Sequence, residues 1–242
     1  MQEGLAEIIM ALFQKFLELL GRATMFSVGA VCFAVTTFFF FLELFGFTIE
    51  GRRITRNKYR WDSTDIALMA MSAALYGGAL TATAGIPVIP GYTWFRPGNA
   101  LVPVFALFFG LPGCFGCALG NLIADAFGGY LGLGSTAGFL ANFMSAYMIY
   151  KLVKDPKLST ARAFLDYYLW AVIINGLVVA FTISFFLDLL ELLPYFVVWT
   201  LFFGNVFFNN LIAQGILGPL VVKPLYGRIK ASGLYCKDRL AE

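Results

Sequence analysis

The sequence predicts an all-α integral membrane protein, because of its composition, its long apolar runs and the placement of its basic residues. Of the 242 residues, 60% are hydrophobic and 13% are charged, whereas a soluble domain averages about 45–50% apolar and about 25% charged residues. The apolar residues fall in runs close to the ~20 residues that an α-helix needs to cross a bilayer. Lysine and arginine gather between these runs. We therefore expect a multi-pass protein of the cell (plasma) membrane, embedded in the lipid bilayer.

The first part of the chain differs from the rest. Residues 4–20 are apolar at helical spacing, but they carry the charged residues Glu7, Lys15 and Glu18. This pattern predicts an amphipathic helix on the membrane surface, or the lead-in to the first span. The acidic start is unlike a cleaved signal peptide. With an extra transmembrane helix and a basic linker, residues 1–62 form a unit ahead of the main bundle.

The apolar runs predict seven membrane segments, at residues 24–48, 64–84, 98–111, 114–130, 136–151, 165–188 and 195–222. Basic residues concentrate in 49–63, in 151–164 and after residue 222. Four predicted spans separate the first of these regions from the second, and two separate the second from the third, so all three lie on one side of the membrane. The positive-inside rule makes that side cytoplasmic, and the C-terminus with it. Residues 63–224 are then a six-helix membrane domain, and 225–242 a cytoplasmic tail.

Two of these segments are short. Residues 98–111 and 114–130 would extend about 20 and 25 Å at 1.5 Å per residue, against a hydrocarbon core of about 30 Å. Pro112 and its neighbouring glycines join them without a charged loop. Irregular backbone at membrane depth is tolerated where it is buried in protein or lines a cavity. We therefore expect this stretch to lie inside the bundle.

Several chemistries are excluded by residues that the chain lacks. It contains no histidine, so Ser-His-Asp catalysis, His-ligated metals and His-bound haem are ruled out. It contains no G-x-x-x-x-G-K-[ST] loop for ATP hydrolysis. Cys114 and Cys117 have the spacing of a redox or zinc pair, but no second pair accompanies them, and packing is the simpler interpretation. We expect no catalytic residue, no metal, no cofactor and no nucleic-acid partner.

One cation and one carboxylate stand out as candidate site residues. Arg96 is the only basic residue expected on the external side of the last six spans. Asn121 and Asp125 lie one helical turn apart in an apolar segment, where an unpaired carboxylate costs several kcal/mol and indicates a functional site. Arg96 is the expected partner of Asp125. A purely structural pair, or an aspartate that caps the next helix, is the alternative.

Amides are frequent within the spans, at Asn142, Asn175, Asn205, Asn209, Asn210 and Gln214. Such side chains can simply bridge helices, or they can converge to read the donor and acceptor edge of a planar heterocycle. Tyr92 and Trp94 lie in the Pro- and Gly-containing loop 85–97, which is long enough to fold over an external opening as a lid.

A stripe of small residues runs along the segment 67–84. Ala67, Ala70, Ala74 and Gly77 recur at intervals of three and four residues, which lets another helix approach closely. The stripe indicates either packing inside this chain or a docking face for a separate membrane subunit.

These features resemble the substrate-binding S components of energy-coupling factor (ECF) transporters. The resemblance covers about 64–224 and rests on the alanine-rich first helix of the six, the capping loop and the run FGLPGCFGCALGNLIADAFGG. Within that group, WFRPGNALVPV is most similar to the F-R-x-x-E-A-L pattern of queuosine-precursor S components, with Asn99 in place of the glutamate.

The resemblance implies a six-helix S-component-like bundle plus one extra N-terminal transmembrane helix. It implies a transmembrane coupling subunit and two cytoplasmic ATPase subunits as partners, docked on the alanine-rich face. It also implies a small heterocyclic, vitamin-like substrate, such as a queuosine precursor, taken up from outside. The residues expected to bind it are Arg96, Asn99, Asn121, Asp125, Asn142, Asn205 and Asn209, with Tyr92 and Trp94 as a cap.

Three other classes of protein are weaker alternatives. An autonomous secondary transporter would normally contain a structural repeat with interrupted helices in both halves, and only one interrupted region is present. An intramembrane enzyme would have to rely on Asp125 and the amides. A non-transporting membrane scaffold is the third alternative.

Overall fold

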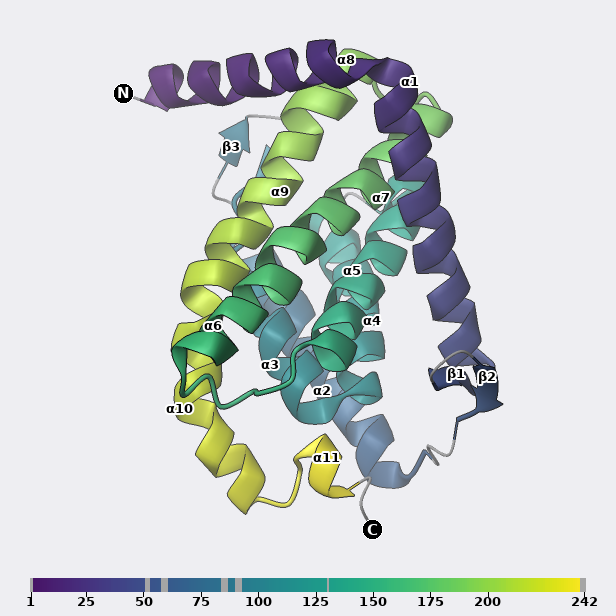
Figure 1. The fold of residues 1–242 in the computed structure, drawn as a ribbon, viewed down its shortest axis with the longest axis vertical. Coiled ribbons are helices and arrows are strands. Elements are labelled where there is room, and N and C mark those ends of the chain that lie inside the picture. Colours follow the sequence, from purple (N-terminus) through teal and green to yellow (C-terminus); the bar gives the residue numbers. More distant parts are fainter. Residues whose placement is uncertain are drawn as a thin grey trace.

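A computed structural model describes residues 2–50, 53–57, 61–83, 87–89, 93–129 and 131–239. The chain folds as a bundle of helices with two small β-hairpins (Figure 1). The predicted all-α membrane fold is confirmed. Helices form at each of the seven predicted segments, although several of their ends differ from the predicted ones.

Helix α1 (Gln2–Leu44) has two arms that meet at Gly21, whose φ of 72° and ψ of 152° interrupt the helix. The first arm lies across one end of the bundle, and the second runs along its side (Figure 1). The second arm packs closely on α7, because a side chain at Gly29 would meet Phe185 and Trp199. Arg22 also forms an ion pair with buried Asp188 at 3.0 Å. The extra N-terminal helix is therefore an integral part of the bundle.

The first span ends earlier than the predicted residue 48. Gly46, with φ of 75°, follows the helix. Strands β1 (Phe47–Glu50) and β2 (Arg53–Arg56) then pair as an antiparallel hairpin, which the β-branched residues of this stretch favour.

Helix α2 (Ser63–Thr83) begins with a reciprocal cap. The backbone N–H of Asp65 donates to Asp62 Oδ1, and the backbone N–H of Asp62 donates to Asp65 Oδ2, in the manner of a capping box. The N–H of Asp65 and the Arg239 guanidinium hold the pKa of Asp62 below its ordinary value. The start of α2 is thereby tied to the C-terminal segment.

Strands β3 (Pro87–Ile89) and β4 (Thr93–Trp94) form the second hairpin, and a 3₁₀ turn η1 (Pro97–Ala100) leads into the short helix α3 (Leu101–Phe109). Helix α4 (Leu111–Gly128) follows after one residue, Gly110, with φ of 65°. The junction between the short helices is thus Gly110 and not Pro112, which lies in the first turn of α4. All of α3 after its first residue is buried, so this stretch lies inside the bundle as predicted.

The remaining helices are α5 (Leu133–Leu152) and two long interrupted helices. The first joins α6 (Ala161–Tyr167), η2 (Tyr168–Ile174) and α7 (Asn175–Leu189). The second joins α8 (Tyr195–Val197), η3 (Val198–Phe202), α9 (Phe203–Ile212), η4 (Ala213–Leu217) and α10 (Gly218–Ala231). The segments η2, η3 and η4 are π-helical; such wider turns often occur at functional sites.

The last segment folds back onto the bundle. After α10, the short helix α11 (Cys236–Arg239) places Cys236 within 3.8 Å of the Leu107 carbonyl oxygen. The Arg239 guanidinium donates to Asp65 Oδ1 at 2.7 Å and to both Asp62 oxygens at 3.0 Å. The described part of the predicted tail is therefore packed against α2 and α3.

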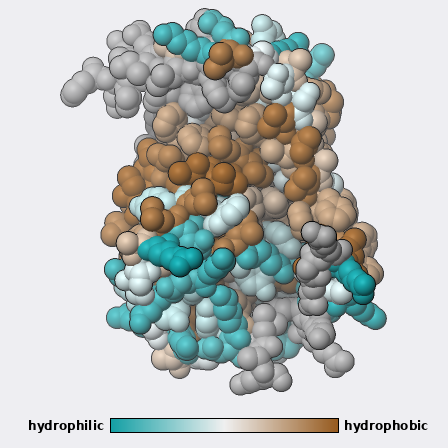
Figure 2. Space-filling view, in the orientation of Figure 1, coloured by the Kyte–Doolittle hydropathy of each residue, from teal (hydrophilic) through white to brown (hydrophobic). Residues whose placement is uncertain are grey.

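Five helical stretches of the described chain are long and apolar enough to cross a membrane: Gly21–Leu44, Ser63–Thr83, Leu111–Gly128, Ala161–Leu189 and Tyr195–Arg239. An apolar band crosses the middle of the visible face, with polar residues toward both ends (Figure 2). The β1–β2 hairpin and α11 lie at one end of the bundle, and β3 and the first arm of α1 lie at the other (Figure 1). The regions predicted to share one side of the membrane thus lie at the same end.

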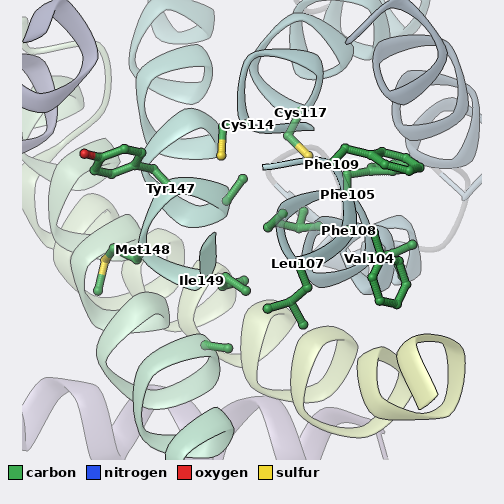
Figure 3. Packing of buried hydrophobic residues seen from close by; sticks show 14 of the residues in the cluster. Val104, Phe105, Leu107, Phe108, Phe109, Cys114, Cys117, Tyr147, Met148 and Ile149 are labelled. Atoms are coloured by element: carbon green, nitrogen blue, oxygen red, sulfur yellow. The ribbon is translucent and has the colours of Figure 1, made fainter. Parts of the chain in front are cut away.

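The main core lies between α3, α4 and α5 (Figure 3). Cys114 and Cys117 of α4 are free thiols that are fully buried there, beside side chains such as Phe108 and Ile149. Their surroundings are hydrocarbon, which supports the interpretation of this pair as packing residues.

Candidate functional site

A cavity of about 240 Å³ lies within the bundle, between η1, α4, α5, α7 and α9. Its polar wall comes from Arg96, Asn99, Asn121, Asp125, Ser135, Asn142, Ser145, Asn205, Asn209 and Asn210. Its apolar wall comes from Val179, Ile183, Leu187, Leu193, Phe202 and Val206. Ligand pockets typically combine such walls and measure about 300–1,000 Å³. The volume of this cavity lies just below that range, which suits a small polar molecule with an apolar face.

Most of the predicted site residues line this cavity. They are Arg96, Asn99, Asn121, Asp125, Asn142, Asn205 and Asn209. Trp94 belongs to strand β4, two residues before Arg96, and the position of its side chain is not described. Tyr92 lies outside the described residues. Four separate elements, η1, α4, α5 and α9, therefore bring together predicted residues that are up to 113 positions apart.

Arg96 and Asp125 are joined through an amide and not by the direct ion pair that we expected. Arg96 Nη1 donates to Asn121 Oδ1 at 3.4 Å, and Asn121 Nδ2 donates to Asp125 Oδ2 at 3.1 Å. No ion pair between Arg96 and Asp125 forms in the described chain. Because neither charge is neutralised by the other at contact distance, both retain hydrogen-bonding capacity toward a ligand.

Asn121 is held from a second side by α5. Asn142 Nδ2 donates to Asn121 Oδ1 at 3.1 Å and to the Gly138 carbonyl at 2.8 Å. The absence of a side chain at Gly138 is what admits Asn121, since an added Cβ would lie 2.7 Å from Asn121 Nδ2. This glycine therefore sets the separation of α4 and α5 at the cavity.

Tyr76 of α2 contacts two residues of the cavity wall but does not line the cavity itself. The side chain is fully buried, and its hydroxyl oxygen lies 2.9 Å from Asn99 Oδ1 and 2.6 Å from Asn142 Oδ1. Because a phenol has one proton, it donates to one of these amides at a time. Tyr76 thus links η1 to α5 and orients two of the amides that face the cavity.

A second chain of hydrogen bonds continues from Asn99 into the bundle. Asn99 Nδ2 donates to Asn210 Oδ1 at 3.1 Å, and Gln214 Nε2 donates to Asn210 Oδ1 and to Ser145 Oγ, both at 3.1 Å. Ser145 Oγ then donates to Asn175 Oδ1 at 2.9 Å. Each of these residues is buried, and their mutual hydrogen bonds offset the cost of removing the bonded groups from water. Gln214 Oε1 is the exception, since it has no hydrogen-bond partner among the described residues.

A third set of hydrogen bonds, made by Asn205 and Asn209 of α9, holds the backbone of Arg96 in place. Its N–H donates to Asn209 Oδ1 at 2.9 Å, and Asn209 Nδ2 donates to Asn205 Oδ1 at 3.0 Å. Asn205 and Asn209 therefore share a helical face, as predicted. The π-helical turns η3 and η4 lie directly before and after α9, and both change the direction in which its side chains point.

Comparison with known proteins identifies the family. The model of the QueT transporter family matches residues 66–227, more than half of the chain. The chain belongs to the QueT transporter family. No curated protein and no solved structure matches it. The match confirms the resemblance found in the sequence, and it makes this chain a membrane transporter of a small substrate.

The QueT family match begins within α2, whose outer face carries the predicted docking residues. Ala67, Ala70 and Ala74 are exposed on this face. Gly77, which was predicted to dock with them, is instead buried against α4, where an added Cβ would lie 2.9 Å from the Gly120 carbonyl oxygen. The alanines therefore do not serve packing within the described chain, whereas Gly77 does.

Several residues of this cavity and of its supporting hydrogen bonds were not predicted from the sequence. Asn210 and Gln214 were noted as intramembrane amides but not assigned to the site, and Ser145 was not noted. Tyr76 belongs to the same α2 segment as the alanine stripe, on the opposite face. Its phenol at a buried helical position was the signal that could have identified it.

Proposed function

We propose that this QueT family protein is the substrate-binding subunit of an ATP-driven uptake transporter of the ECF type. It would capture a small heterocyclic micronutrient from outside the cell and release it to the cytoplasm. The observation that carries this proposal is the cavity within the bundle, where one guanidinium, one carboxylate and several amides converge on one volume. The chain lacks a phosphate loop, so the energy would come from partner ATPases.

The chemistry of the cavity favours a planar heterocycle with a mixed donor and acceptor edge. Hydrogen bonds connect Asn121, Asn142 and Asp125 as a row of polar groups in the cavity wall. Phe202 and the apolar residues of α7 form the apolar part of the wall. A queuosine precursor, a 7-deazapurine base, has such an edge and such a ring face. Asn99 in place of the glutamate of the related pattern would supply an amide where those proteins supply a carboxylate.

The exposed alanines of α2 are the proposed docking face for the coupling subunit. Ala67, Ala70 and Ala74 allow a partner helix to approach closely, and two cytoplasmic ATPases would complete the assembly. In this arrangement residues 63–224 form the substrate-binding domain, 1–62 an added membrane segment and 225–242 a cytoplasmic C-terminus. The β3–β4 hairpin beside Arg96 would act as an external lid that includes Trp94 and Tyr92.

Two measurements on the purified full-length protein test this function. Mass spectrometry of the small molecules released from detergent-extracted protein should find a single heterocyclic base, and affinity purification from cells should recover two phosphate-loop ATPases with a membrane partner. Liposomes that contain the chain alone should show no uptake of that base. Uptake by the lone chain, driven by an ion gradient, would instead identify an autonomous secondary transporter.

A further inference from the structure

The β1–β2 hairpin lies outside the residues that match the QueT family, and the proposed transport site does not use it. Phe47 pairs with Arg56, and Ile49 pairs with Ile54. Because side chains alternate along a strand, these four residues share one face of the hairpin. The exposed fractions of Phe47, Ile49 and Ile54 are 44%, 40% and 58%. This face, hereafter the hairpin face, is therefore apolar, exposed and edged by an arginine.

The hairpin face continues the apolar outer surface of α1. Phe38, Phe41 and Phe45 are exposed along the last turns before the hairpin, and the stretch Gly21–Leu44 is long enough to span a bilayer. The hairpin therefore begins where a membrane-spanning helix ends. In a bilayer that this helix spans, that position would be the boundary between acyl chains and headgroups.

The opposite face holds the hairpin firmly on the bundle. Thr48 Oγ1 donates to Glu43 Oε1 at 3.3 Å, and Asn57 Nδ2 donates to Glu43 Oε2 at 2.9 Å. Glu43 also forms an ion pair with Lys151 of α5 at 3.3 Å. These contacts keep the hairpin face directed away from the bundle, so its exposure is built into the fold.

The charge of the segment is basic. Arg53 and Arg56 are both exposed, and the sequence adds Arg52, Lys58 and Arg60 around them, against a single acidic residue, Glu50. Arginine binds phosphate through paired N–H groups, and basic residues next to a span are attracted to anionic lipid.

We propose that the hairpin is an interfacial binding site for anionic phospholipids. Phe47, Ile49 and Ile54 enter the outer part of the acyl region, and the guanidinium group of Arg56 on the same face contacts a lipid phosphate. Arg53, which is exposed on the other face opposite Glu50, adds positive charge at the headgroup level. An amphipathic surface with basic residues at its edge binds a membrane in this way. The partner is a lipid headgroup and not free phosphate, because the apolar residues contribute only when acyl chains are present.

The test uses the full-length protein in a neutral detergent, titrated with phosphatidylglycerol while its thermal unfolding is followed. A lipid that binds the folded state raises the unfolding temperature with a measurable midpoint concentration. The double variant Arg53→Gln/Arg56→Gln should shift this midpoint about 25-fold higher, at roughly fivefold per basic residue. Arg228→Gln/Lys230→Gln removes two exposed charges from α10 and serves as the matched control, with an expected midpoint near that of wild type.

Further arms separate the lipid from other ligands. Ile49→Ser/Ile54→Ser should also raise the midpoint, whereas phosphatidylcholine or sodium phosphate in place of phosphatidylglycerol should leave the unfolding temperature unchanged. An equal response to phosphatidylcholine or to free phosphate would overturn the proposal. So would an unchanged midpoint in the arginine variant, or an equal loss in the α10 control.

Discussion

At the scale of single residues, the cavity depends on groups that orient one another. Asn121 is the centre of this arrangement, since it contacts Arg96, Asp125 and Asn142 within 3.4 Å. A rigid, pre-oriented set of donors and acceptors reduces the entropy that a ligand must lose on binding. Tyr76 extends the same set without contributing to the cavity lining itself.

The Tyr76→Phe variant should bind substrate about tenfold more weakly, because Asn99 and Asn142 lose a shared buried partner, at a cost of roughly 1–3 kcal/mol. Isothermal titration with a queuosine-precursor base measures this affinity. Tyr168→Phe is the control, since its hydroxyl donates to the Gly215 carbonyl away from the cavity lining. Equal affinity of wild type and Tyr76→Phe would show that the phenol does not position the amides.

At the scale of elements, the close packing of α2 on α4 links the outer face of α2 to the cavity. Gly116 and Gly120 of α4 face α2, where an added Cβ would meet Ser72 or the Ala73 carbonyl at 2.5 and 2.9 Å. Asn121 and Asp125 lie directly after this contact on α4. The two helices therefore form one rigid unit with the alanines on one side and cavity residues on the other.

Two neighbouring glycines of α2 test this packing. Gly77→Ala should destabilise the protein by about 1–3 kcal/mol, because its Cβ would overlap the backbone of α4. Gly78→Ala is the matched control: its Cβ meets nothing within 4 Å, so the intrinsic helix preference should stabilise the fold by up to about 1 kcal/mol. Thermal unfolding in detergent compares the two. A neutral Gly77→Ala variant would contradict the close α2–α4 contact.

The outer face of α2 has a separate prediction. Ala70→Leu/Ala74→Leu should abolish recovery of the membrane partner and its ATPases, because the larger side chains prevent close approach of a second helix. Ligand affinity of the isolated protein should stay within about twofold of wild type, since both alanines are exposed and outside the cavity. Copurification from cells measures assembly. Undiminished recovery of the partners would exclude this face as the docking site.

For the whole molecule, the sequence predicted the membrane fold and seven of the ten polar residues that line the cavity. Long apolar runs determine spans directly, and a lone Arg96 with an intramembrane Asp125 indicates a polar interior. The hydrogen-bond partners of Arg96 and Asp125 could not be predicted, because they depend on how each helix is rotated about its axis. Asn121 of α4 fits between Arg96 and Asp125 because Gly138 of α5 has no side chain that would overlap it. The β1–β2 hairpin was missed for another reason, since β1 lies at the end of a continuous apolar run and β2 lies in the basic stretch that follows it.

The extra helix α1 gives the molecule an asymmetric outer surface. It covers α7 at Gly29 and is fixed at one end by Arg22 and Asp188 and at the other by Glu43 and Lys151. The exposed alanines of α2 remain uncovered. In the proposed assembly, the shape of the bundle as well as the alanines would therefore direct a partner subunit toward α2.

Binding of a queuosine-precursor base to the purified full-length protein, measured by isothermal titration, tests the central claim most directly. Wild type should bind one base per chain. Asn121→Ala and Asp125→Ala should each weaken binding by at least about tenfold, since each removes a polar contact at the centre of the cavity. Thr83→Ala, at the end of α2 and outside the lining, should leave it unchanged. Full affinity in both cavity variants would contradict the assignment of this cavity as the substrate site.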